Sequence, residues 1–216
     1  MNEKFPQIND GFNFACTLCG DCCRGEQEVL LNWYDLYKMA QYLGFGHTAD
    51  LFAKGWVELV RDKNQTVWRP RIRFKEKPLR FCPFLINELQ DDGQLKGYCQ
   101  LHPGHKPLVC ALAPVGCRYD SETKRTDFIL VPPTEDCPGM QSQQWNDLQA
   151  YLRPFKEELN FQSLFFEVME QLKNRNCRRE QYEKIVFSFP VKETFAAALQ
   201  VLRGQLQQAF NLTWRS

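Results

Sequence analysis

The sequence lacks any long hydrophobic run. Among its 216 residues no stretch reaches the roughly 18 consecutive apolar residues that a membrane-spanning helix requires. Residues 1–10 are polar and contain no apolar segment of the kind that a secretory signal needs. We therefore expect a cytoplasmic protein with no membrane partner.

An excess of charge of one sign is also absent. The chain has 27 lysines and arginines against 26 aspartates and glutamates, which gives a formal net charge of +1. A near-neutral chain exerts no overall attraction on nucleic acid or on anionic membranes. The basic and aromatic stretch between Arg69 and Phe81 fits a strand that binds nucleic acid, and equally the solvated face of an ordinary strand. We do not expect nucleic acid as a partner, and a protein partner or substrate stays unknown.

The common catalytic motifs are missing. The sequence contains no G-x-S-x-G, no H-E-x-x-H and no glycine-rich phosphate loop. No G-x-G-x-x-G follows a predicted strand, so no conventional dinucleotide or S-adenosylmethionine pocket is predicted. The sequence therefore leaves open whether the protein is an enzyme.

Cysteine is abundant. The chain has ten cysteines, and four of them lie within eight residues, at Cys16, Cys19, Cys22 and Cys23. Thiolates are soft metal ligands, and a C-x-x-C turn directs two of them to one metal ion or cluster. A single C-x-x-C also fits a redox dithiol. The C-x-x-C-x-x-C-C run favours a metal-binding loop.

Disulfide bonds are the alternative interpretation of the ten cysteines. Structural disulfides are rare in a reducing compartment, where clustered cysteines more often bind metal. A bond between the adjacent Cys22 and Cys23 would also be strained. We therefore favour metal binding.

Further cysteines follow in recognisable contexts. Cys82 lies in a C-P-F-L sequence, Cys99 and Cys110 enclose a segment that ends in K-P-L-V-C, and Cys137 begins C-P-G. With the opening run, these motifs resemble the YkgJ-type cysteine-cluster family, a zinc- or iron-chelating domain related to flagellin lysine N-methylase-like proteins. The resemblance covers roughly residues 12 to 140 and departs from the family pattern at Lys106, where arginine is usual. It implies metal chelation by eight cysteines: Cys16, Cys19, Cys22, Cys23, Cys82, Cys99, Cys110 and Cys137.

The number and arrangement of these thiolates bear on the metal. Eight thiolates fill two four-ligand sites, either two iron–sulfur clusters or two zinc ions, and a single centre with spare thiols is the further alternative. Structural zinc usually takes its ligands from two C-x-x-C turns. Three thiolates in one tight series with single cysteines later fit a cubane cluster better, so we favour iron–sulfur over zinc.

Four other side chains are weaker candidates. His102 and His105 form an H-x-x-H pair that fits zinc, but loop residues outside any site give the same pattern. Cys117 fits either a spare ligand or a small buried side chain, and we expect Cys177 to bind no metal.

Three functions are consistent with these observations. The first is a cytosolic protein that holds iron–sulfur clusters or zinc through the C-x-x-C-x-x-C-C run and the later cysteines. The second, implied by the resemblance, is a protein-modifying enzyme similar to flagellin lysine N-methylases. The third is an interaction module that zinc stabilises.

The pattern of apolar residues predicts an α+β protein. We expect a metal-tied domain with few short strands over residues 1–140, and a helical C-terminal extension packed on it over residues 141–216. The hydrophobic fraction of 44% is enough for a core. Periodicity and turn residues predict helices over 33–43, 48–60, 143–152, 161–174 and 191–210, and strands over 26–31, 66–74, 84–86, 95–98 and 126–131.

Overall fold

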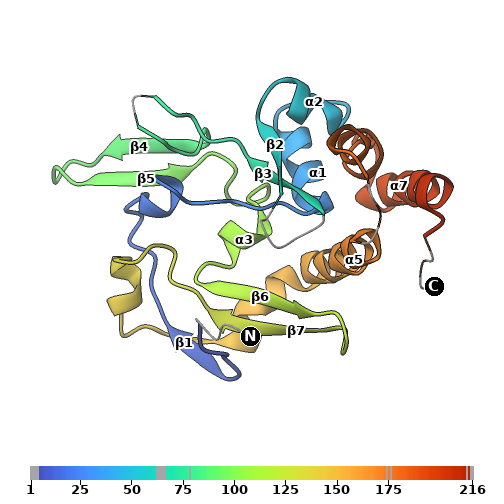
Figure 1. The fold of residues 1–216 in the computed structure, drawn as a ribbon. Helices are drawn as coiled ribbons and strands as arrows, with labels where there is room; N and C mark the ends of the chain where they lie inside the picture. Colours follow the sequence, from blue (N-terminus) through green and yellow to red (C-terminus); the bar gives the residue numbers. More distant parts are fainter. Residues whose placement is uncertain are drawn as a thin grey trace.

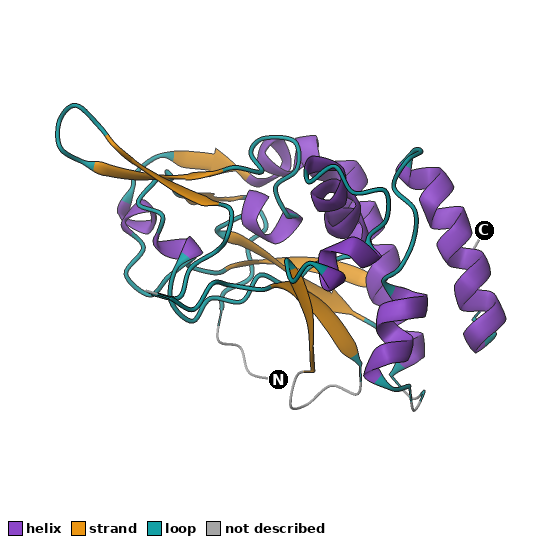
Figure 2. Ribbon diagram, turned by 90° about the horizontal axis from the view of Figure 1, so that it is seen from above, coloured by secondary structure: helices purple, strands orange, loops and turns teal. Residues whose placement is uncertain are grey.

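The computed structural model describes residues 5–61, 67–77, 79–173, 175, 177–212 and 214. It combines helices with short antiparallel strands, which confirms the α+β class, and its C-terminal part is helical (Figure 1 and Figure 2). None of the helices within those ranges is both long enough and apolar enough to cross a membrane.

The strands form separate antiparallel pairs and, within the described chain, no larger sheet. A two-stranded pair is at best marginally stable in water, so each pair depends on what packs against it. The β4–β5 hairpin projects from the body in both views, whereas β2–β3 lies against the helices (Figure 1 and Figure 2). The pairs are β1 (Gly11–Asn13) with β8 (Trp145–Asp147), β2 (Val57–Arg61) with β3 (Trp68–Ile72), β4 (Leu85–Leu89) with β5 (Leu95–Cys99), and β6 (Val115–Asp120) with β7 (Arg125–Leu130).

Three longer helices make up most of the helical part. They are α1 (Trp33–Tyr42), α5 (Lys156–Leu172) and α7 (Phe195–Phe210). A capping box begins α1, because the side chains of Asn32 and Asp35 each accept a hydrogen bond from the other's backbone N–H. The short helical segments are η1 (Asp21–Cys23), α2 (Ala49–Ala53), α3 (Leu108–Ala111), η2 (Pro138–Gln141), α4 (Leu148–Leu152), η3 (Arg153–Phe155), α6 (Arg179–Gln181) and the π-helix η4 (Tyr182–Val186).

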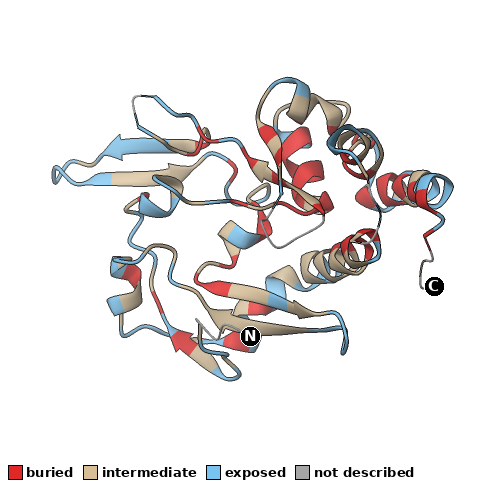
Figure 3. Ribbon diagram, in the orientation of Figure 1, coloured by how far each residue is buried: buried red, intermediate tan, exposed pale blue. Residues whose placement is uncertain are grey.

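The larger hydrophobic core joins the two ends of the chain. The ring of Trp33 on α1 meets the edge of Phe165 on α5, with ring centroids 5.2 Å apart, and Leu202 of α7 is fully buried in the same cluster. Buried side chains on α1, α5 and α7 thus form one interior (Figure 3). The predicted boundary at residue 140 is not tested by this arrangement and stays a prediction.

A second, smaller core lies beneath the β1–β8 and β6–β7 pairs. Its buried side chains include Phe12 of β1, Leu112 after α3 and Leu148 of α4. Leu108 at the start of α3 is also fully buried there. The segment that leads to Cys110 is therefore anchored between the two cores.

The predicted helix over 48–60 is wrong in its second half. The chain forms only α2, and Gly55 then adopts a left-handed φ of 72° that ends the helix. From Val57 the side chains alternate between more and less buried, as a strand paired with β3 requires. The polar end predicted for this helix at residues 62–64 lies outside the described residues.

The strand predicted over 26–31 is also wrong. This segment makes an isolated bridge between Leu30 and Arg71, flanked by backbone hydrogen bonds from Leu31 N to Pro70 O and from Ile72 N to Val29 O. Proline has no N–H to donate, so Pro70 limits any ladder along this edge of β3.

Other elements agree with the pattern within a few residues. The β4–β5 hairpin, β7 and α7 lie where the sequence predicts them, and α7 is capped by the side chain of Thr194. Two boundaries differ. Helix α5 begins at Lys156 rather than at 161, and residues 145–147 form β8 because the Asp147 side chain caps α4 only from Leu148 onward. The predicted end of α5 at residue 174 lies outside the described residues.

Candidate metal centre

The C-x-x-C-x-x-C-C run folds into a loop that ends in the single turn η1. Leu18 and Gly20 both adopt left-handed backbone conformations, with φ of 59° and 76°. The loop packs on the β4–β5 hairpin, where Gly97 N donates to Leu18 O at 2.6 Å. An added Cβ at Gly97 would lie 2.6 Å from the Cα of Gly20, so this approach requires glycine.

Cys23 and Cys82 lie opposite each other although 59 positions separate them. Arg24 and Phe81 form an antiparallel bridge, which makes Cys23 and Cys82 the next pair in register. Cys82 N donates to Cys23 O at 2.8 Å. Opposite residues of this kind have Cα atoms about 5.5 Å apart, so both thiols start from neighbouring backbone positions.

The β4–β5 hairpin places Cys99 beside Cys82. Cys99 ends β5 and pairs with Leu85, and Leu85 N donates to Cys82 O at 3.1 Å. After Cys99 the chain returns to α3, whose third residue is Cys110.

Helix α1 fixes the segment that precedes Cys110. Asp35 Oδ1 accepts a hydrogen bond from Leu108 N at 2.8 Å, and Lys38 Nζ donates to Lys106 O at 2.8 Å. Lys38 is itself buried and pairs with Glu158 of α5 at 2.5 Å. Because these partners are remote in the chain, the position of Cys110 depends on the assembled helices.

Electrostatic interactions connect five of the predicted ligands: Cys22, Cys23, Cys82, Cys99 and Cys110. A hydrogen bond with Cys23, and then burial, raise the pKa of the Cys22 thiol well above its usual value. For Cys23, the hydrogen bond with Cys22 lowers the thiol pKa. A hydrogen bond with Cys82 and burial outweigh this effect, and the pKa rises above its usual value to about 12.

Burial is the first cause of the raised pKa values of Cys99 and Cys110. Neighbouring thiols add to it, because one thiolate repels the formation of another. Lys106 acts in the opposite direction and lowers the pKa of Cys22, Cys99 and Cys110. The five sulfurs therefore share one partly buried region that a positive charge stabilises.

Three predicted ligands lie at the margin of this region. Cys19 and Cys22 both raise the pKa of Cys137, after burial, so Cys137 lies near the loop. Gly139 makes that approach possible, because an added Cβ there would lie 2.6 Å from Ala15 O. Cys16 is exposed and interacts with Tyr151.

The side chains as they stand do not form a coordination site. Within the ranges described above, no group of three or more His, Cys, Asp or Glu side chains is arranged to hold a metal ion. A cysteine redirects its sulfur by rotation about χ1 alone. The fold thus supplies the convergence of soft donors, which suits zinc or iron–sulfur chemistry, and the sulfurs need rotation to reach a common ion.

Of the weaker candidates, His102 meets the cluster through its backbone, whose hydrogen bond lowers the pKa of the Cys99 thiol. The ring of His105 lies 5.5 Å from that of Tyr42, and His102 follows Cys99 in a backbone turn. Cys117 on β6 hydrogen-bonds with Gln162, and Cys177 interacts with Arg175 and Tyr182.

Sequence reasoning missed the contribution of α1. The buried Asp35 and Lys38 carried the signature of a capping box and a helix face, and nothing local linked them to a cysteine. In the sequence Lys106 stands out only as a departure from a family pattern, whereas in the fold it is a cation that interacts with three of the thiols.

No family model, no curated protein and no solved structure matches this chain.

Proposed function

We propose that this protein binds a metal through its cysteine cluster, as iron–sulfur or as zinc. The observation that supports the proposal is the meeting of Cys22, Cys23, Cys82, Cys99 and Cys110, which come from four separate parts of the chain. Burial and neighbouring thiols raise the pKa of Cys22, Cys23, Cys99 and Cys110, so these thiols stay protonated without a metal. A bound cation would stabilise their thiolate forms and release the protons.

The inner ligands of the proposed centre are Cys23, Cys82, Cys99 and Cys110. They are the members that helix α1, the 23–82 pair and the β4–β5 hairpin fix in place. Four thiolates complete either a tetrahedral zinc site or a four-iron cluster. When bound, the metal supplies positive charge and either a structural crosslink or a redox centre.

A second centre would draw on the outer cysteines. Cys137 interacts with Cys19 and Cys22, and Cys16 belongs to the same loop. Because Cys22 and Cys23 are adjacent, their side chains can serve different centres. We favour iron–sulfur over zinc, since the tight C-x-x-C-x-x-C series fits a cubane better than two zinc knuckles. The methylase-like and interaction-module functions stay predictions.

The test is metal content after anaerobic purification. We expect a brown protein with iron and acid-labile sulfide, or a colourless one with stoichiometric zinc. The variant Cys110→Ser should lose the metal of the inner centre, whereas Cys177→Ser, which changes a thiol outside the region, should retain all of the metal. Full-length protein with neither metal, or equal metal in both variants, would contradict the proposal.

A further inference from the structure

The β4–β5 hairpin leaves the outer edge of β4 unpaired. Gln90 N donates to Gln94 O at 2.8 Å, which makes these two residues a hydrogen-bonded pair of the hairpin. Along an antiparallel strand, hydrogen-bonded positions alternate with positions whose N–H and C=O face away from the partner strand. Asn87 and Leu89 occupy positions of the second kind, and among the described residues no other segment bonds to their backbone groups. The strand thus presents a row of unpaired backbone donors and acceptors.

The opposite edge of the hairpin is covered. Gly97 of β5 donates its outward N–H to the carbonyl of Leu18, which belongs to the cysteine loop. Along β4, by contrast, residues 86–89 are all exposed. An added strand can therefore join the hairpin only along β4.

Two leucines near the tip of the hairpin are exposed. Leu89 and Leu95 lie directly opposite each other, on the same face of the ribbon, and are 73% and 51% exposed. The hairpin projects from the body of the molecule (Figure 1). On the same face, nearer the body, Gly97 approaches Gly20 of the cysteine loop. The face that packs on this loop thus continues into solvent as a pair of apolar side chains.

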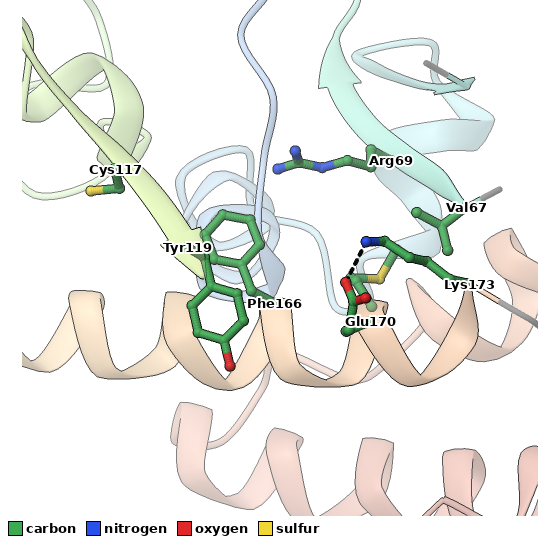
Figure 4. A pocket seen from close by; sticks show the side chains of 8 residues that line it. Val67, Arg69, Cys117, Tyr119, Phe166, Glu170 and Lys173 are labelled. Atoms are coloured by element: carbon green, nitrogen blue, oxygen red, sulfur yellow. Dashed lines mark ion pairs between the residues drawn. The ribbon is translucent and has the colours of Figure 1, made fainter. Parts of the chain in front are cut away.

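The β6–β7 hairpin shows the contrasting arrangement. Its Val115 is buried in the smaller core. Tyr119 of β6 stacks on Phe166 of α5 with ring centres 5.6 Å apart, beside the hollow drawn in Figure 4. Exposure of apolar side chains is therefore not a general property of the hairpins in this fold, and at β4–β5 it marks a surface open to a partner.

Negative charge predominates at the tip of the β4–β5 hairpin. Glu88, Asp91 and Asp92 are exposed, and none of them pairs with a cation among the described residues. The one cation of the two strands, Lys96, donates from Nζ to Thr17 O at 3.3 Å. This edge therefore favours a partner with positive charge.

The same charges disfavour a second copy of this chain as the added strand. Antiparallel pairing of β4 with its own copy about a two-fold axis places the two Glu88 side chains opposite each other or within two positions of each other. Like charges at such positions are destabilising. A strand that carries lysine or arginine there gains an attraction instead.

We propose that the outer edge of β4 is a docking site for an extended basic segment of another protein, which adds to the hairpin as a third strand. The alternation of a strand determines the chemistry of this segment. Its residues alternate between the face of Leu89 and Leu95, which favours apolar side chains, and the face of Glu88, which favours lysine or arginine. The site is independent of the proposed metal centre, because none of these three residues is a predicted ligand.

The test is titration of the full-length protein with a fluorescent, end-capped peptide of alternating valine and lysine, followed by anisotropy. This lysine peptide should bind, and its affinity should fall with added salt. The same peptide with glutamate in place of lysine should not bind. No binding of the lysine peptide, or equal binding of the two peptides, would overturn the proposal.

Two variants separate the backbone contact from the charge. Leu89→Pro removes an outward N–H that the β4–β5 ladder does not use, and should weaken binding by about tenfold. Glu88→Gln should weaken binding by about threefold, as expected for one cross-strand charge pair. Glu122→Gln, in the turn between β6 and β7, is the matched control and should leave the affinity unchanged. Unchanged affinity in both β4 variants would overturn the proposal.

Hydrogen exchange locates the added strand even if Leu89→Pro fails to fold. In the wild type, the lysine peptide should slow exchange at the amides of Asn87 and Leu89 and leave the amide of Glu122 unchanged. Slower exchange only at other amides would overturn the proposal. So would a dimer of the free protein that Leu89→Pro abolishes, because the occupant of the edge would then be a second copy.

Discussion

Asp35 in the first turn of α1 accepts a hydrogen bond from the backbone N–H of Leu108, 73 positions away and two residues before Cys110. The same carboxylate also completes the capping box of α1. One buried side chain thus ties the start of a core helix to the segment that carries an inner ligand of the proposed centre.

The first prediction concerns the pH dependence of this contact. Burial raises the pKa of Asp35 from 3.8 to about 6, while Lys38 opposes the rise. Between these values the folded protein binds more protons than the unfolded chain, so the contribution of Asp35 to stability falls as the pH rises. Asp35→Asn removes this titration. From about pH 4 to about pH 7, the wild type should lose stability relative to the variant, on the order of 2 kcal/mol.

The measurement is urea unfolding of both proteins across that pH range. The variant should be the less stable protein at low pH, because an amide replaces one acceptor oxygen by a donor that faces a backbone N–H. A difference in unfolding free energy that is constant with pH would show that Asp35 does not titrate as its burial implies.

The second prediction concerns the glycine contact beneath the cysteine loop. Gly97→Ala places a Cβ 2.6 Å from the Cα of Gly20, so one backbone has to move. We expect a loss of stability of about 1 to 3 kcal/mol and a lower metal content. Gly104→Ala is the matched control, because its added Cβ meets no atom within 4 Å. Thermal unfolding and metal analysis of the two variants check this, and equal behaviour would refute it.

The third prediction follows from the register between Cys23 and Cys82. Their opposed positions, joined by the bond from Cys82 N to Cys23 O, match the Cα separation of a disulfide. Mild oxidation of the metal-free protein should therefore link these two thiols, with loss of two electrons and two protons. Peptide mapping after diamide treatment should find the 23–82 link ahead of any link to Cys177. Random pairing would show that the register does not control the chemistry.

The fourth prediction concerns the core that joins both ends of the chain. Leu202 on α7 is fully buried among side chains from α1 and α5. Leu202→Ala should cost about 2 to 5 kcal/mol, because the cavity it leaves cannot fully collapse. Val201→Ala, at an exposed neighbouring position, should cost less than about 1 kcal/mol. Chemical denaturation of both variants tests this, and similar losses would argue against a shared core.

Local signals predicted the elements whose determinants lie close together in the chain. Helix α1 begins at a capping box whose two residues, Asn32 and Asp35, are three positions apart. Strands β4 and β5 are joined by a short turn at residues 91–93. Leu59 and Val60 continue the helical spacing of Leu51, so the pattern predicts a helix where the structure has a strand. The strand forms because Gly55 ends the helix and β3 provides a partner.

The sequence predicts which residue types form the candidate site, but it does not predict which of the cysteines lie together in the fold. The C-x-x-C-x-x-C-C run identified the donors, but nothing in the sequence separated the inner Cys110 from the marginal Cys16. That distinction comes from long-range contacts, such as those of Asp35 and Lys38 with residues 106–108. Arg69 also belonged to a basic stretch in the sequence, and its place against Phe166 depends on the docking of α5.

The most direct test of the account is X-ray absorption spectroscopy at the metal edge on anaerobically purified protein. The account predicts a first shell of four sulfurs, at about 2.3 Å for zinc, in the wild type and in Cys177→Ser, and a lower amount of sulfur-bound metal per protein in Cys110→Ser, which loses the inner centre. A shell of oxygen or nitrogen ligands, or an unchanged amount of sulfur-bound metal in Cys110→Ser, would contradict it.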